Sequence, residues 1–193
     1  MFLKKFIGFV LARIYIVSAP SGAGKTSLVK SVMREVADIL LPVSHTTRKK
    51  RVGEKHGVDY YFVDKQDFLY MVDAGQMIEY AKVFGNYYGV SKEEASNALG
   101  ENKDIFFEID WQGARSIKEI FPNAVSIFIM PPSLDVLRQR LVARGQDDEM
   151  TIDYRMELAI NEMSHKDEYD HIIINDCFEE SVSKLIKIII NNR

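Results

Sequence analysis

The most constraining feature of this 193-residue chain is a short glycine-rich segment between a strand-like run and a helical pattern. Residues 14–18 are apolar and partly β-branched, which predicts a buried strand, and apolar residues at helical spacing predict a helix over 25–37. The segment between them reads Ala19-Pro20-Ser21-Gly22-Ala23-Gly24-Lys25-Thr26. It matches the pattern GxxxxGK(S/T), except that Ala19 replaces the first glycine. Strand, glycine loop and helix in this order predict a phosphate-binding loop.

Each residue type in the loop has a physical reason to be there. Gly22 and Gly24 let backbone N–H groups approach phosphate oxygens at a helix N-terminus, whose dipole favours anions. Lys25 can reach a phosphate in transfer, and the Thr26 hydroxyl can bind Mg²⁺ that is also held by ATP phosphates. We therefore expect residues 19–26 to bind ATP and Lys25 to be catalytic. The alternative is a glycine turn that only ends a strand. ATPases, GTPases and small-molecule kinases share this loop, so it does not identify a second substrate.

The remaining pattern predicts an α/β protein. Apolar runs at 105–109, 125–129 and 171–174 alternate with helical patterns at 115–120, 134–143, 152–163 and 180–190, as in a parallel sheet with helices on both faces. Two segments interrupt this alternation. Residues 43–98 are rich in aromatic and charged residues, with strand-like pieces at 59–63 and 77–83 and a helix at 65–73, and residues 138–166 are charged and helical. We expect both to be insertions at the carboxyl edge of the sheet, where open α/β folds bind ligands.

Composition limits the class of protein. The net charge of -3 does not favour a nucleic-acid partner. A single cysteine excludes an internal disulfide bond, makes a zinc site improbable and fits the cytoplasm. Residues 1–12 contain two lysines and an apolar run, like a clipped signal peptide, but the run is too short to span a membrane and no cleavage site follows. We expect an N-terminal extension over 1–13 and no membrane partner.

The segment 44–62 combines cations, hydroxyls and tyrosines. Arg48 and Arg51 could grip a phosphate through charge-assisted hydrogen bonds, and Tyr60 could add a hydroxyl. One alternative is a solvated loop of mixed charge, which is what most such runs are. Another is a nucleic-acid patch, against which Glu54 and Asp59 count.

Five short motifs in order carry a family resemblance. Thr46-Thr47-Arg48 is followed by Arg51, Glu54, a glycine and Tyr60-x-Phe62, and then by Phe84-Gly85-Asn86-Tyr87-Tyr88-Gly89, Asp110-Trp111-Gln112-Gly113, Arg144-Gly145-Gln146 and Ile174-Asn175-Asp176. Together they resemble the guanylate kinase family, from about residue 14 to the C-terminus. The resemblance implies transfer of the ATP γ-phosphoryl group to GMP, and also to dGMP, with Mg²⁺. It implies a three-layer P-loop core over 14–42, 99–137 and 167–193, a small mixed α/β GMP-binding insertion over 43–98 and a helical lid over 138–166.

The resemblance also implies roles for single residues. The GMP-binding residues would be Ser44, Arg48, Arg51, Tyr60, Glu79, Tyr88, Glu108 and Asp110, the catalytic ones Lys25, Arg48, Asp110, Arg140, Arg144 and Arg155, and Asn175 would lie by the adenine. The Glu79 carboxylate can accept two hydrogen bonds from guanine, a pattern that adenine cannot supply. Arg140 and Arg144 are four residues apart and would share a helix face, and Arg138 could join them.

Simpler alternatives stay open for several of these residues. Glu79 could face solvent on its strand, and Asp110 could be only a cap where a strand passes into a turn. The sequence Asn175-Asp176 could be a plain turn. The lid arginines could pair with Glu157 or Glu162 on an exposed helix hairpin.

Two departures from the family pattern concern substrate binding. Val90 stands where similar proteins have a serine or threonine that contacts guanine, and Glu108 stands where an aspartate is usual. The alternatives for the whole chain are a kinase for another nucleoside monophosphate and a non-catalytic binding module with a degraded nucleotide site. The intact Lys25 and Thr26 count against the module. The oligomeric state stays open.

Overall fold

A computed structural model describes residues 12–145 and 147–193. The expected extension over 1–13 therefore lies almost entirely outside the described residues. The central element is a five-stranded sheet in which every neighbouring pair is parallel, as expected. Its strands lie in the order β2 (Ile39–Leu40), β7 (Asp104–Glu108), β1 (Ile14–Ser18), β8 (Val125–Met130) and β9 (His171–Ile174).

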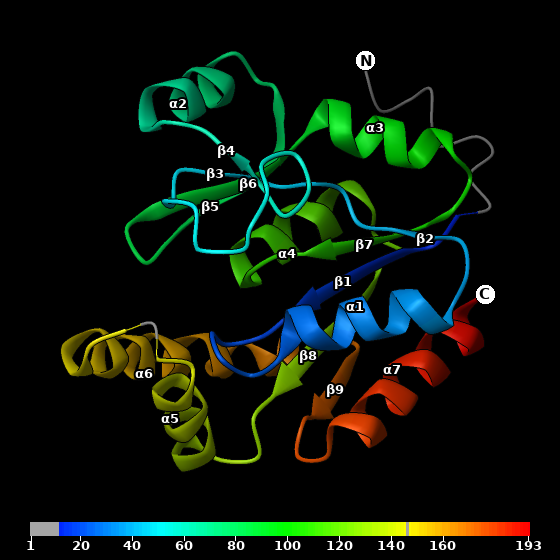
Figure 1. Cartoon of the computed structure of the whole chain (residues 1–193). Coiled ribbons are helices and arrows are strands. Elements are labelled where there is room, and N and C mark those ends of the chain that lie inside the picture. The colour runs from blue at the N-terminus through cyan, green and yellow to red at the C-terminus, as the bar shows by residue number, and fades with distance from the viewer. Residues whose placement is uncertain (1–11, 146) are drawn as a thin grey trace.

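Alternation along the strands divides the core into two apolar layers. Tyr15 and Val17 of β1 pack on one face of the sheet against α1 (Lys25–Glu35) and α7 (Phe178–Asn192), and Ile16 packs on the other face. The second face is covered by α3 (Lys92–Gly100) and α4 (Trp111–Ile120). Figure 1 shows the two helix layers on opposite sides of the strands. The expected three-layer α/β fold is confirmed.

The insertion has a second, mixed sheet. Its strands lie in the order β4 (Tyr61–Phe62), β3 (His45–Thr46), β6 (Asn86–Ser91) and β5 (Met77–Val83), and α2 (Lys65–Asp73) packs on it through a stack of Phe68 on Tyr87. Glu79 follows a bulge in β5, where the register with β6 shifts after Met77. Bulges re-aim side chains, and this one places Glu79 on the buried side of the strand.

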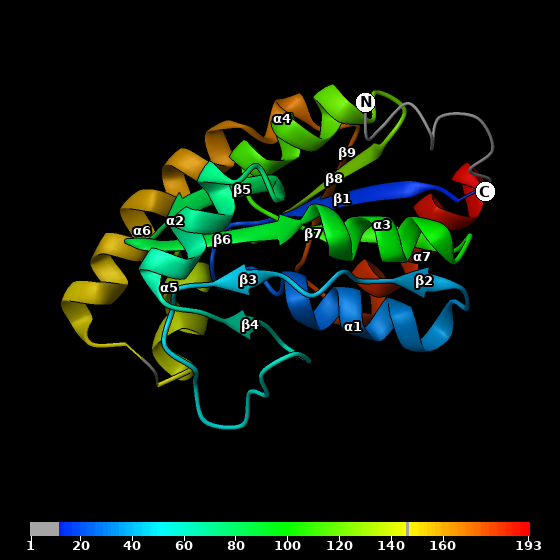
Figure 2. The same ribbon diagram turned by 90° about the horizontal axis from the view of Figure 1, so that it is seen from above.

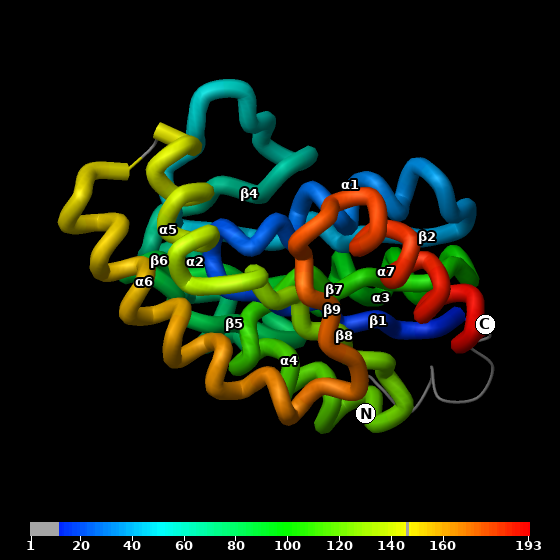
Figure 3. The backbone as a smooth tube through the Cα atoms, turned by 90° about the horizontal axis from the view of Figure 1, so that it is seen from below, coloured from blue at the N-terminus to red at the C-terminus, as the bar shows by residue number. Residues whose placement is uncertain are grey.

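A helical hairpin forms the third part. It consists of α5 (Leu134–Ala143) and α6 (Glu149–Ser164), followed by a short 3-10 helix (Lys166–Glu168). Figures 2 and 3 show this hairpin at the same end of the central sheet as β5 and β6, away from the C-terminus. Helix α5 begins four residues before the expected start of the lid at 138. None of the helices described is long and apolar enough to cross a membrane.

Candidate active site

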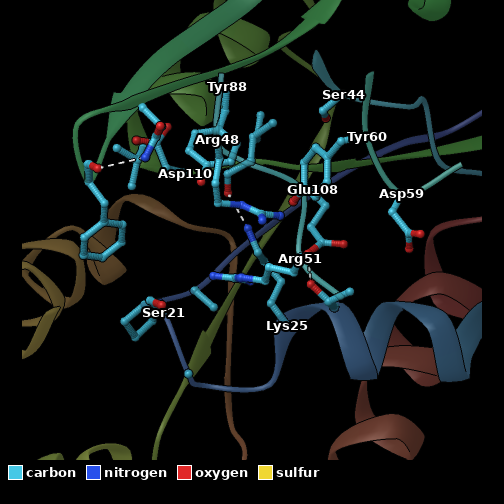
Figure 4. A pocket seen from close by; sticks show the side chains of 18 of the residues that line it. Ser21, Lys25, Ser44, Arg48, Arg51, Asp59, Tyr60, Tyr88, Glu108 and Asp110 are labelled. Atoms are coloured by element: carbon cyan, nitrogen blue, oxygen red, sulfur yellow. Dashed lines mark hydrogen bonds between the residues drawn. The ribbon is translucent and has the colours of Figure 1, made fainter. Parts of the chain in front are cut away.

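A cavity of about 900 Å³ lies where the three parts meet. Almost all predicted site residues of the described chain line it: Ala19, Pro20, Ser21, Gly22, Gly24, Lys25, Thr26, Ser44, Arg48, Arg51, Tyr60, Glu79, Tyr88, Glu108, Asp110, Arg140, Arg144 and Arg155. Ala23 and Asn175 are the two that do not. Figure 4 shows Ser21 and Lys25 on one side of the cavity, Ser44, Tyr60 and Tyr88 on the other, and Arg51 between them. The fold thus brings the phosphate loop to face the segment 44–62, which we call the cationic segment.

The phosphate loop has the conformation that its glycines predict. Gly22 and Gly24 have φ values of 96° and 97°, which L side chains rarely adopt. Gly24 also has no room for a side chain, because an added Cβ would lie 2.5 Å from Nδ2 of Asn175. That same amide nitrogen donates a 2.7 Å hydrogen bond to the Ala23 carbonyl. Asn175, 4 % exposed and predicted to lie by the adenine, therefore fastens the loop from the end of β9.

Lys25 and Thr26 reach the end of β7. The Lys25 ammonium donates to the Ile109 carbonyl at 3.3 Å, and the Thr26 hydroxyl donates to the Glu108 carboxylate. Hydroxyl and carboxylate oxygens are ligands that suit Mg²⁺, which is usually held by one or two protein oxygens and substrate phosphates. The residues present therefore fit the expected ion. No group of three or more His, Cys, Asp or Glu residues that could hold a metal occurs within the described residues.

The two arginines of the cationic segment differ in their partners. Arg48 forms a two-pronged pair with Glu54, with Nη2–Oε1 and Nη1–Oε2 distances of 2.6 and 3.1 Å, and lies over the Tyr60 ring. Glu54 also accepts from the Arg51 backbone N–H at 2.7 Å. The Arg51 guanidinium has no such partner in the described chain, and burial and the repulsion of Arg48 and Arg144 lower its pKa. The guanidinium remains cationic in spite of this lowering, so Arg51 can bind an anion that enters the cavity.

The Tyr60 hydroxyl stays protonated. Burial raises the pKa of Tyr60, with further increases from Glu108 and Tyr88, whose ring centroid is 6.1 Å away. A neutral phenol is a hydrogen-bond donor, so Tyr60 adds a donor without adding charge. Ser44 lines the same wall of the cavity.

Glu79 is almost completely buried at 5 % exposure. Its Oε1 accepts from the Val90 backbone N–H at 2.9 Å. Its Oε2 occupies space that only a glycine leaves open, because a Cβ added to Gly113 would lie 2.5 Å from that oxygen. The pKa of Glu79 is raised to about 8, mainly by burial and then by Asp110, against the opposite effects of the Val90 N–H and Lys25. The alternative of a solvent-facing glutamate is therefore wrong.

The departure at Val90 has a structural basis. Its side chain is 2 % exposed and packs in the apolar layer with Ile16, Ala95 and Phe107, while its backbone orients Glu79. Val90 therefore fits an apolar position whose packing needs no hydroxyl.

Asp110 caps a helix and also lines the cavity. Its Oδ1 accepts from the Gly113 N–H at 2.9 Å and caps α4, and its side chain lines the cavity. Capping fixes the carboxylate at the carboxyl end of β7.

The lid arginines make contacts other than the ion pairs with Glu157 or Glu162 that the simpler alternative would give. Arg140 donates to the Asn175 carbonyl at 2.8 Å, and Arg155 donates to the Ser21 hydroxyl at 2.8 Å. Arg144 and Arg155 share the carboxylate of Asp147, rather than Glu157 or Glu162. Arg138, which we grouped with them, instead pairs with Asp153 and Glu149 and is absent from the cavity wall.

Sequence reasoning gave no role in the site to three acidic residues. Glu54 lies in the segment 44–62 and Asp147 in the charged segment 138–166, and neither stands out there, although Glu54 lies three residues after Arg51. Glu162 lines the cavity, and burial raises its pKa to about 7, opposed by Lys25. Its position seven residues after Arg155 puts both on one face of α6, which is the pattern that could have identified it.

Known proteins resemble this chain over nearly its whole length. A family model described as guanylate kinase matches residues 11–192. A guanylate kinase of Chromohalobacter salexigens is 53% identical over 172 residues, which are 89% of this chain and 80% of that protein, and one of Coxiella burnetii is 48% identical over 178 residues, 92% and 86% of the two chains. The crystal structure of guanylate kinase from Anaplasma phagocytophilum superposes with a TM-score of 0.78 at 36% identity, covering 93% of this chain and 85% of that one.

Proposed function

Because this chain belongs to the guanylate kinase family, we propose that its cavity holds ATP and GMP together and that the chain transfers the ATP γ-phosphoryl group to GMP, giving ADP and GDP. The observation that carries the proposal is that the phosphate loop and Arg51, which has no carboxylate partner among the described residues, face each other across one cavity. Such transfer requires two highly charged groups to be held in line, with cations on several sides.

The donor side is the loop 19–26. Its backbone N–H groups and the N-terminus of α1 would hold the phosphates, and Lys25 would leave the Ile109 carbonyl to bind the transferring group. Thr26, with Glu108 beside it, would hold Mg²⁺. The ion supplies charge neutralisation for the phosphates.

The acceptor side is the insertion 43–98. Ser44, Arg48, Arg51, Tyr60 and Tyr88 would hold the GMP phosphate. Glu79 would accept from guanine N1–H and the 2-amino group, and its burial makes a base without these donors costly to bind. The family resemblance also implies dGMP as an acceptor, and we include it in the proposal.

The lid 138–166 completes the site. Arg140, Arg144 and Arg155 would neutralise charge on the group in transfer, and the closed lid would exclude water that would hydrolyse ATP. Asp110 would lie near Mg²⁺ and the acceptor. We assign this reaction to the cytoplasm.

Steady-state rates with Mg·ATP and a panel of GMP, dGMP, AMP, CMP and UMP test the proposal. We expect kcat/KM to be highest for GMP. A better acceptor outside GMP and dGMP would refute the guanine assignment, and a purified protein that does not bind ATP would favour a non-catalytic module. A Glu79→Gln variant that keeps the full preference for GMP would refute the role of that carboxylate.

A further inference from the structure

Asp147 is a buried carboxylate that joins two lid arginines. Its Oδ2 lies 2.7 Å from Nη2 of Arg144, and its Oδ1 lies 3.1 Å from Nη2 of Arg155. The Asp147 side chain is 9 % exposed. Both arginines line the cavity, whereas Asp147 does not. The carboxylate therefore supports the arginines from outside the cavity wall.

The other contacts of Arg155 are uncharged. Its Nη1 donates to the Ser21 hydroxyl at 2.8 Å, and its guanidinium lies 4.7 Å from the centre of the Phe84 ring. Arg144 carries the same charge, and two guanidinium groups near one another repel. Asp147 is the only carboxylate of the described chain that pairs with either arginine. It thus offsets a repulsion that Ser21 and Phe84 cannot offset.

The arginine pair retains donors for a ligand. A guanidinium has five N–H groups, and Asp147 accepts one bond from each arginine. The Nε atoms of Arg144 and Arg155 and Nη1 of Arg140 are buried and have no hydrogen-bond partner within the described residues. Buried donors are normally satisfied, so these atoms indicate an anion that enters from the cavity.

We propose that Asp147 is a positioning residue for phosphoryl transfer, which holds Arg144 and Arg155 at the spacing needed to bind one phosphoryl group between them. The inference depends on the proposed function. The opposite role would be a restraint that occupies the phosphate position until ATP displaces it. A restraint of that kind would line the cavity, and Asp147 does not.

Steady-state kinetics of Asp147→Asn test the proposal. The change keeps the size of the side chain and removes its charge. We expect kcat to fall about 10- to 100-fold, with KM for ATP and GMP changing less than about threefold, because the arginines act mainly in the transition state. Asp147→Glu, which keeps the charge, should recover part of kcat. Glu149→Gln is the matched control, because Glu149 is exposed and its only ion pair among the described residues is with Arg138.

A double-mutant cycle with Arg155→Lys shows whether Asp147 acts through this arginine. We expect Asp147→Asn to cost much less kcat when Arg155 is already changed. Losses that multiply in the double variant would overturn the inference, as would an unchanged or increased kcat in Asp147→Asn, or a loss confined to KM. Thermal unfolding of each variant separates these effects from misfolding. A wild-type protein unable to phosphorylate GMP would refute the proposed function instead.

Discussion

Binding of GMP should become tighter as pH rises from neutral, because of Glu79. The pKa of this carboxyl is raised to about 8, first by burial and then by Asp110. Guanine presents two N–H donors, which favour the ionised carboxylate over the protonated acid. GMP must therefore bind to the ionised fraction, which is about 0.09 near pH 7 and about 0.5 near pH 8 for such a group. The ratio predicts an affinity about five times higher near pH 8.

Isothermal titration calorimetry measures this effect directly. Titrations near pH 7 in two buffers with different ionisation enthalpies should show release of about 0.9 proton per GMP bound, and less near pH 8. The GMP phosphate has its second pKa near 6, so it adds little in this window. In Glu79→Gln both the pH dependence and the proton release should disappear. A dissociation constant that is the same at both pH values, with no proton released, would refute the reasoning.

Three substitutions test other parts of the site. Lys25→Ala should abolish nearly all turnover while the protein unfolds at its usual temperature, since the side chain lines the cavity rather than the core; loss of the folded state, measured by circular dichroism, would show that the lysine is structural. Gly113→Ala should raise KM for GMP about tenfold, equivalent to about 1.4 kcal/mol. The reason is that the new methyl group displaces the carboxylate of Glu79, and an unchanged KM would contradict it. Glu54→Gln should also raise KM for GMP about tenfold, with a smaller change in kcat, because the substitution removes the charge that orients Arg48. A loss of kcat alone would assign Glu54 to another step.

Regular elements with clear periodicity could be predicted from the sequence. The bounds of β1, β5, β9, α2 and α5 agree with the predicted ranges. Strands β2 and β3 have two residues each, too few to show any alternation. Helix α3 buries Ala95, Ala98 and Leu99, so its apolar stripe is weak, although Ser91 and Glu94 form a recognisable N-terminal cap.

The cavity wall was predictable for residues whose proposed role is to contact the ligand itself. Phosphate binding demands particular side chains at particular spacings, and the motifs contain them, whereas Glu79 lies outside the motifs and was found through the family resemblance. Glu54 and Asp147 instead pair with arginines of the cavity wall, and these partners are set by how loops fold. A carboxylate in a charged stretch has the same local sequence whether it is solvated or buried. The two cannot be distinguished before the fold is known.

The hydrogen bond from Asn175 to the Ala23 carbonyl also has a consequence for biosynthesis. It joins residues separated by 152 positions, and Asn175 follows β9, the last strand of the central sheet to be made. A growing chain that ends before β9 has the glycine loop but not the amide that fastens it. ATP binding should therefore mature only when the C-terminal strand has left the ribosome and paired with β8. Binding of nucleotide by this chain should therefore mark a late step of folding, although the loop proposed to bind it is among the first segments synthesised.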